Sequence, residues 1–166
     1  MPIGLEQFNA APAQEATEAL RPCLDVERWI AGVVGGRPYA GLDDLIAAAR
    51  AAADPLTPAE IEQALAHHPR IGERARGDSP EAGLSRGEQS GLHLDDDVQR
   101  RLAEGNAAYE RRFDRVFLIR AAGRSSEQIL DQLTTRLGND DETESAVVAD
   151  QLRQIAVLRL QGAVSP

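Results

Sequence analysis

The chain has 166 residues and carries 18 Lys and Arg against 27 Asp and Glu, a formal net charge of −9. This acidity argues against nucleic acid or an anionic membrane as a partner, because both need a cationic protein surface. The single cysteine excludes a disulfide framework and a cysteine-rich zinc or iron–sulfur site. The length suits one domain over residues 1–166. No signal peptide or membrane-spanning apolar run is evident, so we expect a cytoplasmic protein.

The first part of the chain carries helix signals. Asp25 is expected to cap a short helix that ends at Gly35-Gly36. From Leu42 to about residue 53, apolar residues recur at helical spacing, which predicts an amphipathic helix. Thr57-Pro58-Ala59-Glu60 is typical of a helix start with a capping box. This helix should end near His68, because the proline that follows disfavours helical geometry in the residue before it.

The rest of the chain predicts a loop, three helices and one short apolar run. Residues 70–83 hold glycine, proline and mixed charge, which indicates a loop. Helices are expected over about 95–113, from Ser125 to Leu137 and over about 143–161. The run Val116–Ile119 should be buried and extended, but its isolation makes a sheet unfavourable. The predicted fold is therefore all-α, a single compact domain of about seven to eight helices.

His68 is the first candidate for chemistry. At a helix C-terminus the free carbonyls favour a protonated imidazole, and a histidine that titrates near neutrality can donate or accept a proton. The alternative interpretation is a histidine that only terminates its helix. His67 and His68 are adjacent and cannot easily share a metal ion, and His93 is the only other histidine, so we expect no metal site.

The run Ser85-Arg86-Gly87-Glu88 is the second candidate. It matches a capping box, in which Glu88 would bond the backbone of Ser85. A helix N-terminus at Ser85 would also present free amides that can hold an anion. The two interpretations are compatible, and both stay open on the sequence alone.

Arg159 is the third candidate. On the last predicted helix it falls on the same face as Val148, Leu152 and Ile155, in the centre of an apolar stripe. An unpaired cation there would be costly. Arg159 therefore either extends to solvent at the helix end, pairs with a buried carboxylate such as Glu88, or binds an anionic ligand.

Several motifs follow one another along nearly the whole chain. His68-Pro69-Arg70-Ile71-Gly72 precedes Leu84-Ser85-Arg86-Gly87-Glu88-Gln89, and then come Asn106-Ala107-Ala108-Tyr109-Glu110 and the block from Phe113 to Ser125. In this order and spacing they resemble the 2-oxo-4-hydroxy-4-carboxy-5-ureidoimidazoline (OHCU) decarboxylases of the pathway from urate to allantoin.

The resemblance implies an all-helical, cofactor-free and commonly dimeric enzyme, so we expect a homodimer acting on OHCU as a small-molecule substrate. It places the family's essential histidine at His68, its active-site glutamate at Glu88 and its C-terminal arginine at Arg159. The substrate-binding residues that it implies are Pro69, Ser85, Arg86, Gly87, Glu88 and Gln89, together with the segment Phe117, Leu118, Ile119, Arg120 and Ala121.

Two departures from animal members indicate a bacterial-type relative. Animal sequences typically carry Asp-Leu where this chain has Arg70-Ile71, and they often end in a peroxisomal tripeptide that is absent here. Two other functions remain as alternatives. One is another cofactor-free enzyme of ureide metabolism, and the other is an acidic helical protein-interaction module, which would not need a buried Arg159.

Overall fold

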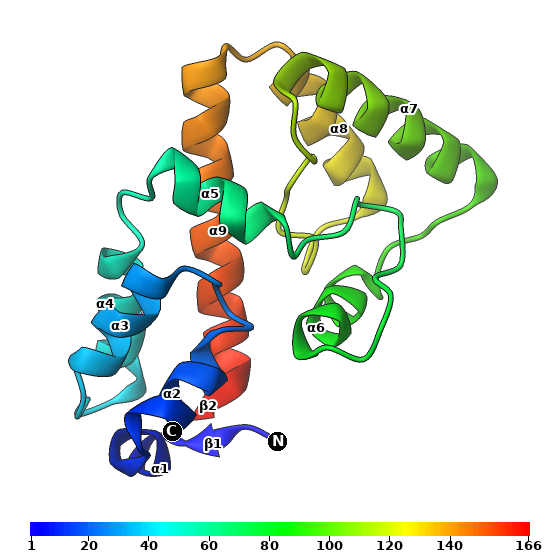
Figure 1. Cartoon of the computed structure of the whole chain (residues 1–166). Coiled ribbons are helices and arrows are strands. Elements are labelled where there is room, and N and C mark those ends of the chain that lie inside the picture. The colour runs from blue at the N-terminus through cyan, green and yellow to red at the C-terminus, as the bar shows by residue number, and fades with distance from the viewer. The chain divides into compact units, whose positions relative to one another are not determined.

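The computed structural model describes all residues 1–166 and contains nine α-helices and one pair of very short strands (Figure 1). The predicted all-α class is confirmed. The helices are α1 (Leu5–Ala10), α2 (Ala13–Leu20), α3 (Glu27–Gly35), α4 (Leu42–Ala52), α5 (Pro58–Leu65), α6 (Pro80–Gln89), α7 (Asp96–Phe113), α8 (Ser126–Leu137) and α9 (Asp141–Ala163). The strands are β1 (Ile3–Gly4) and β2 (Val164–Ser165), which pair in parallel.

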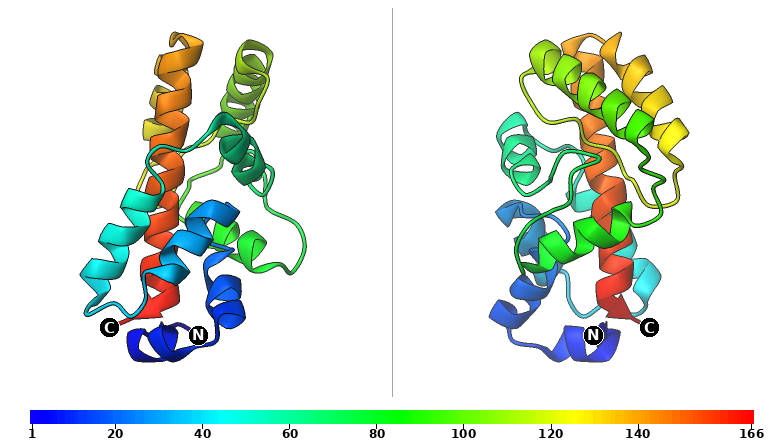
Figure 2. Two further views of the ribbon diagram at one scale, coloured as in Figure 1. Left: turned by 60° about the vertical axis from the view of Figure 1, so that its left-hand side comes forward. Right: turned by 90° about the vertical axis from the view of Figure 1, so that its right-hand side faces the viewer.

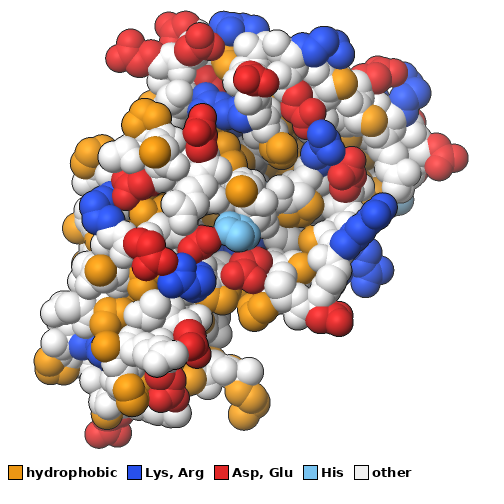
Figure 3. Space-filling view, in the orientation of Figure 1, with side chains coloured by type: hydrophobic (Ala, Val, Ile, Leu, Met, Phe, Trp, Pro, Cys, Tyr) orange, Lys and Arg blue, Asp and Glu red, His pale blue; other side chains and the backbone are white.

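The helix count exceeds the predicted seven or eight because the N-terminal segment folds into the short helices α1 and α2. No helix has both the length and the apolar character that crossing a membrane would require. On the face shown in Figure 3, acidic side chains and arginines are interspersed over the surface. Exposed ion pairs such as Arg100–Asp97 on α7, at 2.6 Å, account for part of this mixture.

The chain divides into two compact units. The terminal unit comprises Met1–Ala64 and Leu152–Pro166, and the central unit comprises Leu65–Gln151. The long helix α9 is continuous through the change from one unit to the other, and both views of Figure 2 show it unbroken. One domain over residues 1–166 stays a prediction from the sequence.

The terminal unit is built around Trp29 on α3, which is fully buried. Its indole Nε1 donates to the carbonyl of Ala49 on α4 at 2.8 Å, so the only polar atom of the side chain is satisfied inside the core. The predicted cap of α3 is wrong. The helix begins after Val26 without a side-chain cap, because the carboxylate of Asp25 instead accepts from Arg21 at 2.7 Å.

The capping box at α5 is confirmed. Glu60 Oε1 accepts from the backbone N–H of Thr57 at 2.8 Å, and Thr57 Oγ1 accepts from the N–H of Glu60 at 3.2 Å. Arg28 on α3 also donates to Glu60, and this charged hydrogen bond is the main reason that the pKa of the Glu60 carboxyl is lowered. The helix ends at Leu65, earlier than the expected end near His68.

The central unit packs α7 against α8. Gly105 on α7 allows a close approach, since a Cβ at this position would collide with Leu133 of α8. The predicted starts of both helices are confirmed: Asp95 caps α7, and Ser125 forms a capping box with Gln128 at α8. On α7, Val98, Leu102 and Tyr109 are buried, whereas Phe113 is half-buried.

A buried ion pair lies in the central unit. Glu144 of α9 is fully buried and Arg136 of α8 is 2% exposed. Glu144 Oε1 accepts from Arg136 Nε at 2.9 Å, from Arg136 Nη2 at 2.6 Å and from the Tyr109 hydroxyl at 2.6 Å. The remaining oxygen accepts from Asn139 at 3.0 Å. The carboxylate is therefore fully hydrogen-bonded, which offsets its desolvation.

Replacing the buried arginine should destabilise the protein strongly. Arg136→Met leaves Glu144 buried without its cation, and we expect the free energy of unfolding to fall by about 3–5 kcal/mol. The control is Arg101→Met, which removes an exposed pair with Glu127 between α7 and α8 and should cost less than ~1 kcal/mol. Urea denaturation followed by circular dichroism measures both, and equal losses would contradict this account.

Candidate functional site

His68 lies in the turn that follows α5, in the central unit. Its backbone N–H donates to the carbonyl of Leu65 at 3.0 Å, and its side chain is half-buried. Pro69 follows directly, and α5 has already ended at Leu65, before His68 is reached. His68 is thus held on an irregular segment next to a helix end rather than on the helix itself.

The predicted helix start at Ser85 is wrong. Helix α6 begins at Pro80, and its cap is Ser79, whose hydroxyl accepts from the N–H of Ala82 at 3.1 Å. Proline at the first helical position favours this earlier start. Ser85 to Gln89 therefore lie inside the helix. Both the capping box between Ser85 and Glu88 and the anion cradle at a Ser85 N-terminus are excluded, because interior amides bond within the helix.

Two side chains of α6 hold the loop that precedes it. Arg86 Nη1 donates to the carbonyls of Ala75 at 3.0 Å and Gly77 at 2.9 Å. Gln89 Oε1 accepts from the N–H of Gly72 at 3.1 Å. On the same helix Ser85 is buried and Glu88 is half-buried. The α6 residues predicted to bind substrate thus lie beside the segment that follows His68.

The run Val116–Ile119 belongs to no sheet, as predicted, and is buried except at Val116, which is half-buried. The segment from Phe117 to Ala121 overlaps this run. Four of its five side chains are at most 5% exposed: Phe117, Leu118, Ile119 and Ala121. The Leu118 carbonyl accepts from Arg136 Nη1 at 2.7 Å, and the N–H of Arg120 donates to Gln151 Oε1 at 2.9 Å. Side chains of α8 and α9 therefore fix this backbone.

Arg159 is buried in the terminal unit, at 5% exposed. The residues predicted to share its face, Val148, Leu152 and Ile155, are at most 3% exposed. Extension of Arg159 to solvent is therefore excluded. Its Nη1 donates to the Pro22 carbonyl at 2.9 Å. Burial raises the pKa of the neighbouring Cys23 thiol to about 12, although the positive charge of Arg159 opposes this rise.

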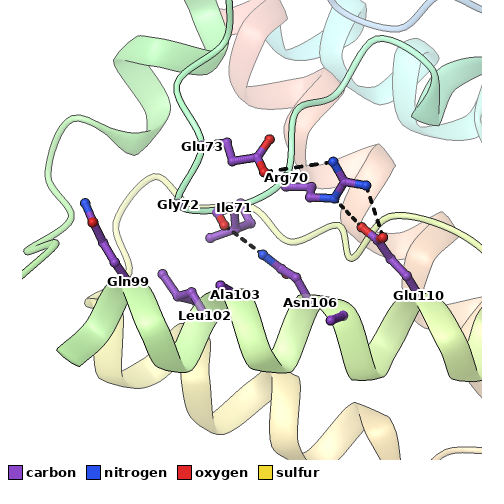
Figure 4. Close-up of a pocket in the computed structure, with 10 residues that line it drawn as sticks. Arg70, Ile71, Gly72, Glu73, Gln99, Leu102, Ala103, Asn106 and Glu110 are labelled. Carbon is purple, nitrogen blue, oxygen red and sulfur yellow. Dashed lines mark hydrogen bonds and ion pairs between the residues drawn. The ribbon is translucent and has the colours of Figure 1, made fainter. Parts of the chain in front are cut away.

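A cavity of about 320 Å³ lies where residues 70–73 cross α7 (Figure 4). Arg70 forms an ion pair with Glu110 across this crossing, with Nε 2.5 Å from Oε1. Asn106 donates from Nδ2 to the Ile71 carbonyl at 2.9 Å. Asn106 and Glu110 belong to the motif Asn106-Ala107-Ala108-Tyr109-Glu110, but the sequence alone gave them no role. Their place in that motif was the available signal.

The model of the OHCU decarboxylase family matches residues 9–161 of this chain. The chain belongs to this family. The OHCU decarboxylase of Amia calva is 35% identical over 163 residues, and the match covers 96% of this chain and 93% of that protein. The OHCU decarboxylase of Haloferax volcanii is 26% identical over 166 residues, covering 95% of this chain and 94% of that protein.

Two solved structures share the fold of this OHCU decarboxylase family member. A crystal structure of OHCU decarboxylase in the presence of (S)-allantoin superposes with a TM-score of 0.70 at 20% identity, over 92% of this chain and 97% of that one. A crystal structure of (S)-allantoin synthase gives a TM-score of 0.73 at 18% identity, over 99% of this chain and 54% of that one. At these identities the similarity establishes the fold.

The site residues expected from the family thus fall in both units. His68, Glu88 and the segment 117–121 belong to the central unit, and Arg159 belongs to the terminal unit. No cluster of three or more His, Cys, Asp or Glu side chains is arranged to hold a metal ion.

Gly72 should resist substitution because its backbone has a φ of +91°. In Gly72→Ala the new Cβ would also lie 3.2 Å from Leu102 Cδ1. We expect a loss of about 1–3 kcal/mol in the free energy of unfolding. Gly91→Ala is the control, since a Cβ there meets open space, and it should change stability by less than ~0.5 kcal/mol. Thermal melts of both variants test this, and an unchanged Gly72→Ala would refute it.

Proposed function

We propose that this chain decarboxylates OHCU to (S)-allantoin, the last step of urate degradation to allantoin. The observation that carries the proposal is the match to the Amia calva OHCU decarboxylase at 35% identity over nearly the full length of both proteins. The burial of Arg159 and the half-buried positions of His68 and Glu88 are consistent with the roles given below.

The reaction needs positioning and one proton. OHCU carries a carboxylate and a hydroxyl on one ring carbon, next to a C=N bond. When the bond to the carboxylate breaks, CO2 leaves and its electron pair moves into the C=N group. One proton is then taken up, on one face of the ring, which fixes the hand of the allantoin. Neither a metal nor an electron-accepting cofactor is required by this route.

His68 is the acid–base group in this proposal. Its imidazole exchanges a proton with the substrate hydroxyl or with the adjacent ring carbon. A half-buried position suits this role, because the ring is held by its surroundings while one side stays accessible. Pro69 restricts the backbone directly after His68. It therefore limits the directions in which the imidazole can point.

Glu88 and Arg159 bind the polar groups of the substrate. Glu88 accepts hydrogen bonds from the ureido N–H groups, and Arg159 holds a carboxylate or another acceptor through charged hydrogen bonds. Arg159 is suited to this because its guanidinium is planar, permanently charged and already fixed by the Pro22 carbonyl. The remaining contacts are proposed for Ser85 to Gln89 and for the backbone of residues 117–121.

The further parts of the proposal rest on the family resemblance and on composition. The enzyme works without a cofactor, as a homodimer, in the cytoplasm, and its Arg70-Ile71 pair supports a bacterial-type member. It binds neither nucleic acid nor membrane, in line with its charge of −9. An acidic interaction module is disfavoured, because the large exposed apolar residues are only Met1, Leu84 and Leu158.

The activity is tested by adding the protein to urate with urate oxidase and hydroxyisourate hydrolase. Fresh OHCU forms in this mixture, and the circular dichroism signal of (S)-allantoin should appear faster than by spontaneous decay. CO2 release in step with that signal separates a decarboxylase from a hydrolase or racemase of ureide metabolism. A rate equal to spontaneous decay would overturn the proposed function.

His68→Ala should lower kcat by ~10²–10⁴-fold, because the proton-exchanging group is lost. His67→Ala is the matched control, since it removes the adjacent, exposed imidazole and should leave the rate unchanged. Both variants are compared in the coupled assay after their melting temperatures are shown to match the wild type. Wild-type activity in His68→Ala would remove His68 from the mechanism.

A further inference from the structure

We propose that Asn106 is a positioning residue for His68, and that it acts by holding the peptide between Ile71 and Gly72. The inference rests on the acid–base role proposed for His68. Asn106 lies on α7 and has no place among the residues expected to contact the substrate.

The Ile71–Gly72 peptide is held on both of its polar groups by side chains from two helices. Its carbonyl accepts from Asn106 Nδ2 of α7 at 2.9 Å, which Figure 4 shows as a dashed line. Its N–H donates to Gln89 Oε1 of α6 at 3.1 Å. A peptide that is bonded in opposite directions to two helices cannot rotate without breaking one of the bonds.

Contacts on either side reinforce this arrangement. The Ile71 side chain is 6% exposed and packs in the same core cluster as Leu102 of α7. Arg70 pairs with Glu110, which lies on α7 one turn beyond Asn106. Only Pro69 and Arg70 separate His68 from the held peptide, and proline fixes its own φ. The position of this peptide therefore limits the orientation of the imidazole.

The side-chain oxygen of Asn106, Oδ1, indicates the role of this asparagine. Asn106 is 4% exposed, and its Oδ1 is buried without a hydrogen-bond partner. Exchanging the two amide atoms would place an oxygen against the Ile71 carbonyl, so the orientation is fixed by that bond. A leucine of similar size would avoid the unpaired oxygen. The asparagine therefore serves to hold the Ile71 carbonyl more than to stabilise the core.

Asn106→Leu tests this role directly in the coupled assay. We expect kcat to fall by ~10–100-fold with KM changed by less than ~3-fold, because the imidazole is displaced while the substrate-binding groups remain. The bond lost at the Ile71 carbonyl is offset in part by removal of the unpaired Oδ1, so the melting temperature should fall by only a few degrees. Gln99→Leu, an exposed change on the same helix and in the same cavity, is the control and should keep the wild-type kcat.

Asn106→Asp adds a readout that a purely structural role would not move. The carboxyl introduced there would be buried, and the charged groups that line the same cavity are Arg70, Glu73 and Glu110. When protonated, this carboxyl can donate to the Ile71 carbonyl, and when ionised it cannot. The kcat of Asn106→Asp relative to wild type should therefore rise as the pH falls, whereas that of Asn106→Leu should not.

The outcomes separate this inference from the proposed function. If His68→Ala is inactive while folded Asn106→Leu and Asn106→Asp keep the wild-type kcat, the positioning role is refuted and the function stands. If His68→Ala itself keeps full activity, the proposed role of His68 fails. Should Asn106→Leu not fold, the pH dependence of Asn106→Asp decides, since a relative kcat that is flat with pH refutes the positioning role. In a His68→Ala background, Asn106→Leu should lower the residual rate no further.

Discussion

The carboxylate of Glu144 is the interaction on which the central unit depends. It is fully buried on α9, and it receives hydrogen bonds from Tyr109 of α7, from Arg136 of α8 and from Asn139 in the turn between α8 and α9. Arg136 then donates to the Leu118 carbonyl. One buried charge thus joins three helices and an irregular segment, and because a charge tolerates few alternative partners it specifies this packing closely.

Local signals predicted some helix starts correctly and failed at α3 and α6. The capping boxes at Thr57 and Ser125 marked the true starts of α5 and α8, because a cap and its helix lie within one turn of each other. At α6 two serines competed. Ser79 with Pro80 starts the helix, and the pattern at Ser85 lies inside it. Residues that match a cap are common in sequences. Which of them caps the helix depends on the hydrogen bonds of the loop before it, and these are not visible in the local sequence.

The candidate site was also predictable only in part from the sequence. The place of Arg159 on an apolar helix face followed from spacing within one helix, whereas its burial was left open by the sequence and is shown by the structure. Neither Glu144 nor Asn106 could be found in this way. Each bonds a partner 35 residues distant, Tyr109 and Ile71 respectively, and no period within one element reports such a contact. The family motif supplied Asn106 as a residue but not its bond.

An all-helical protein has few backbone groups to offer a ligand, since helices consume their own amides and carbonyls except at their ends. The proposed site accordingly uses two irregular stretches of the central unit, around His68 to Gly72 and Phe117 to Ala121. Both are held by polar side chains from helices: Asn106 and Gln89 hold the first, and Arg136 and Gln151 hold the second. These hydrogen bonds from side chains to the backbone therefore fix the positions of both stretches. Asn106 holds the first stretch directly, and Glu144 holds the second through Arg136.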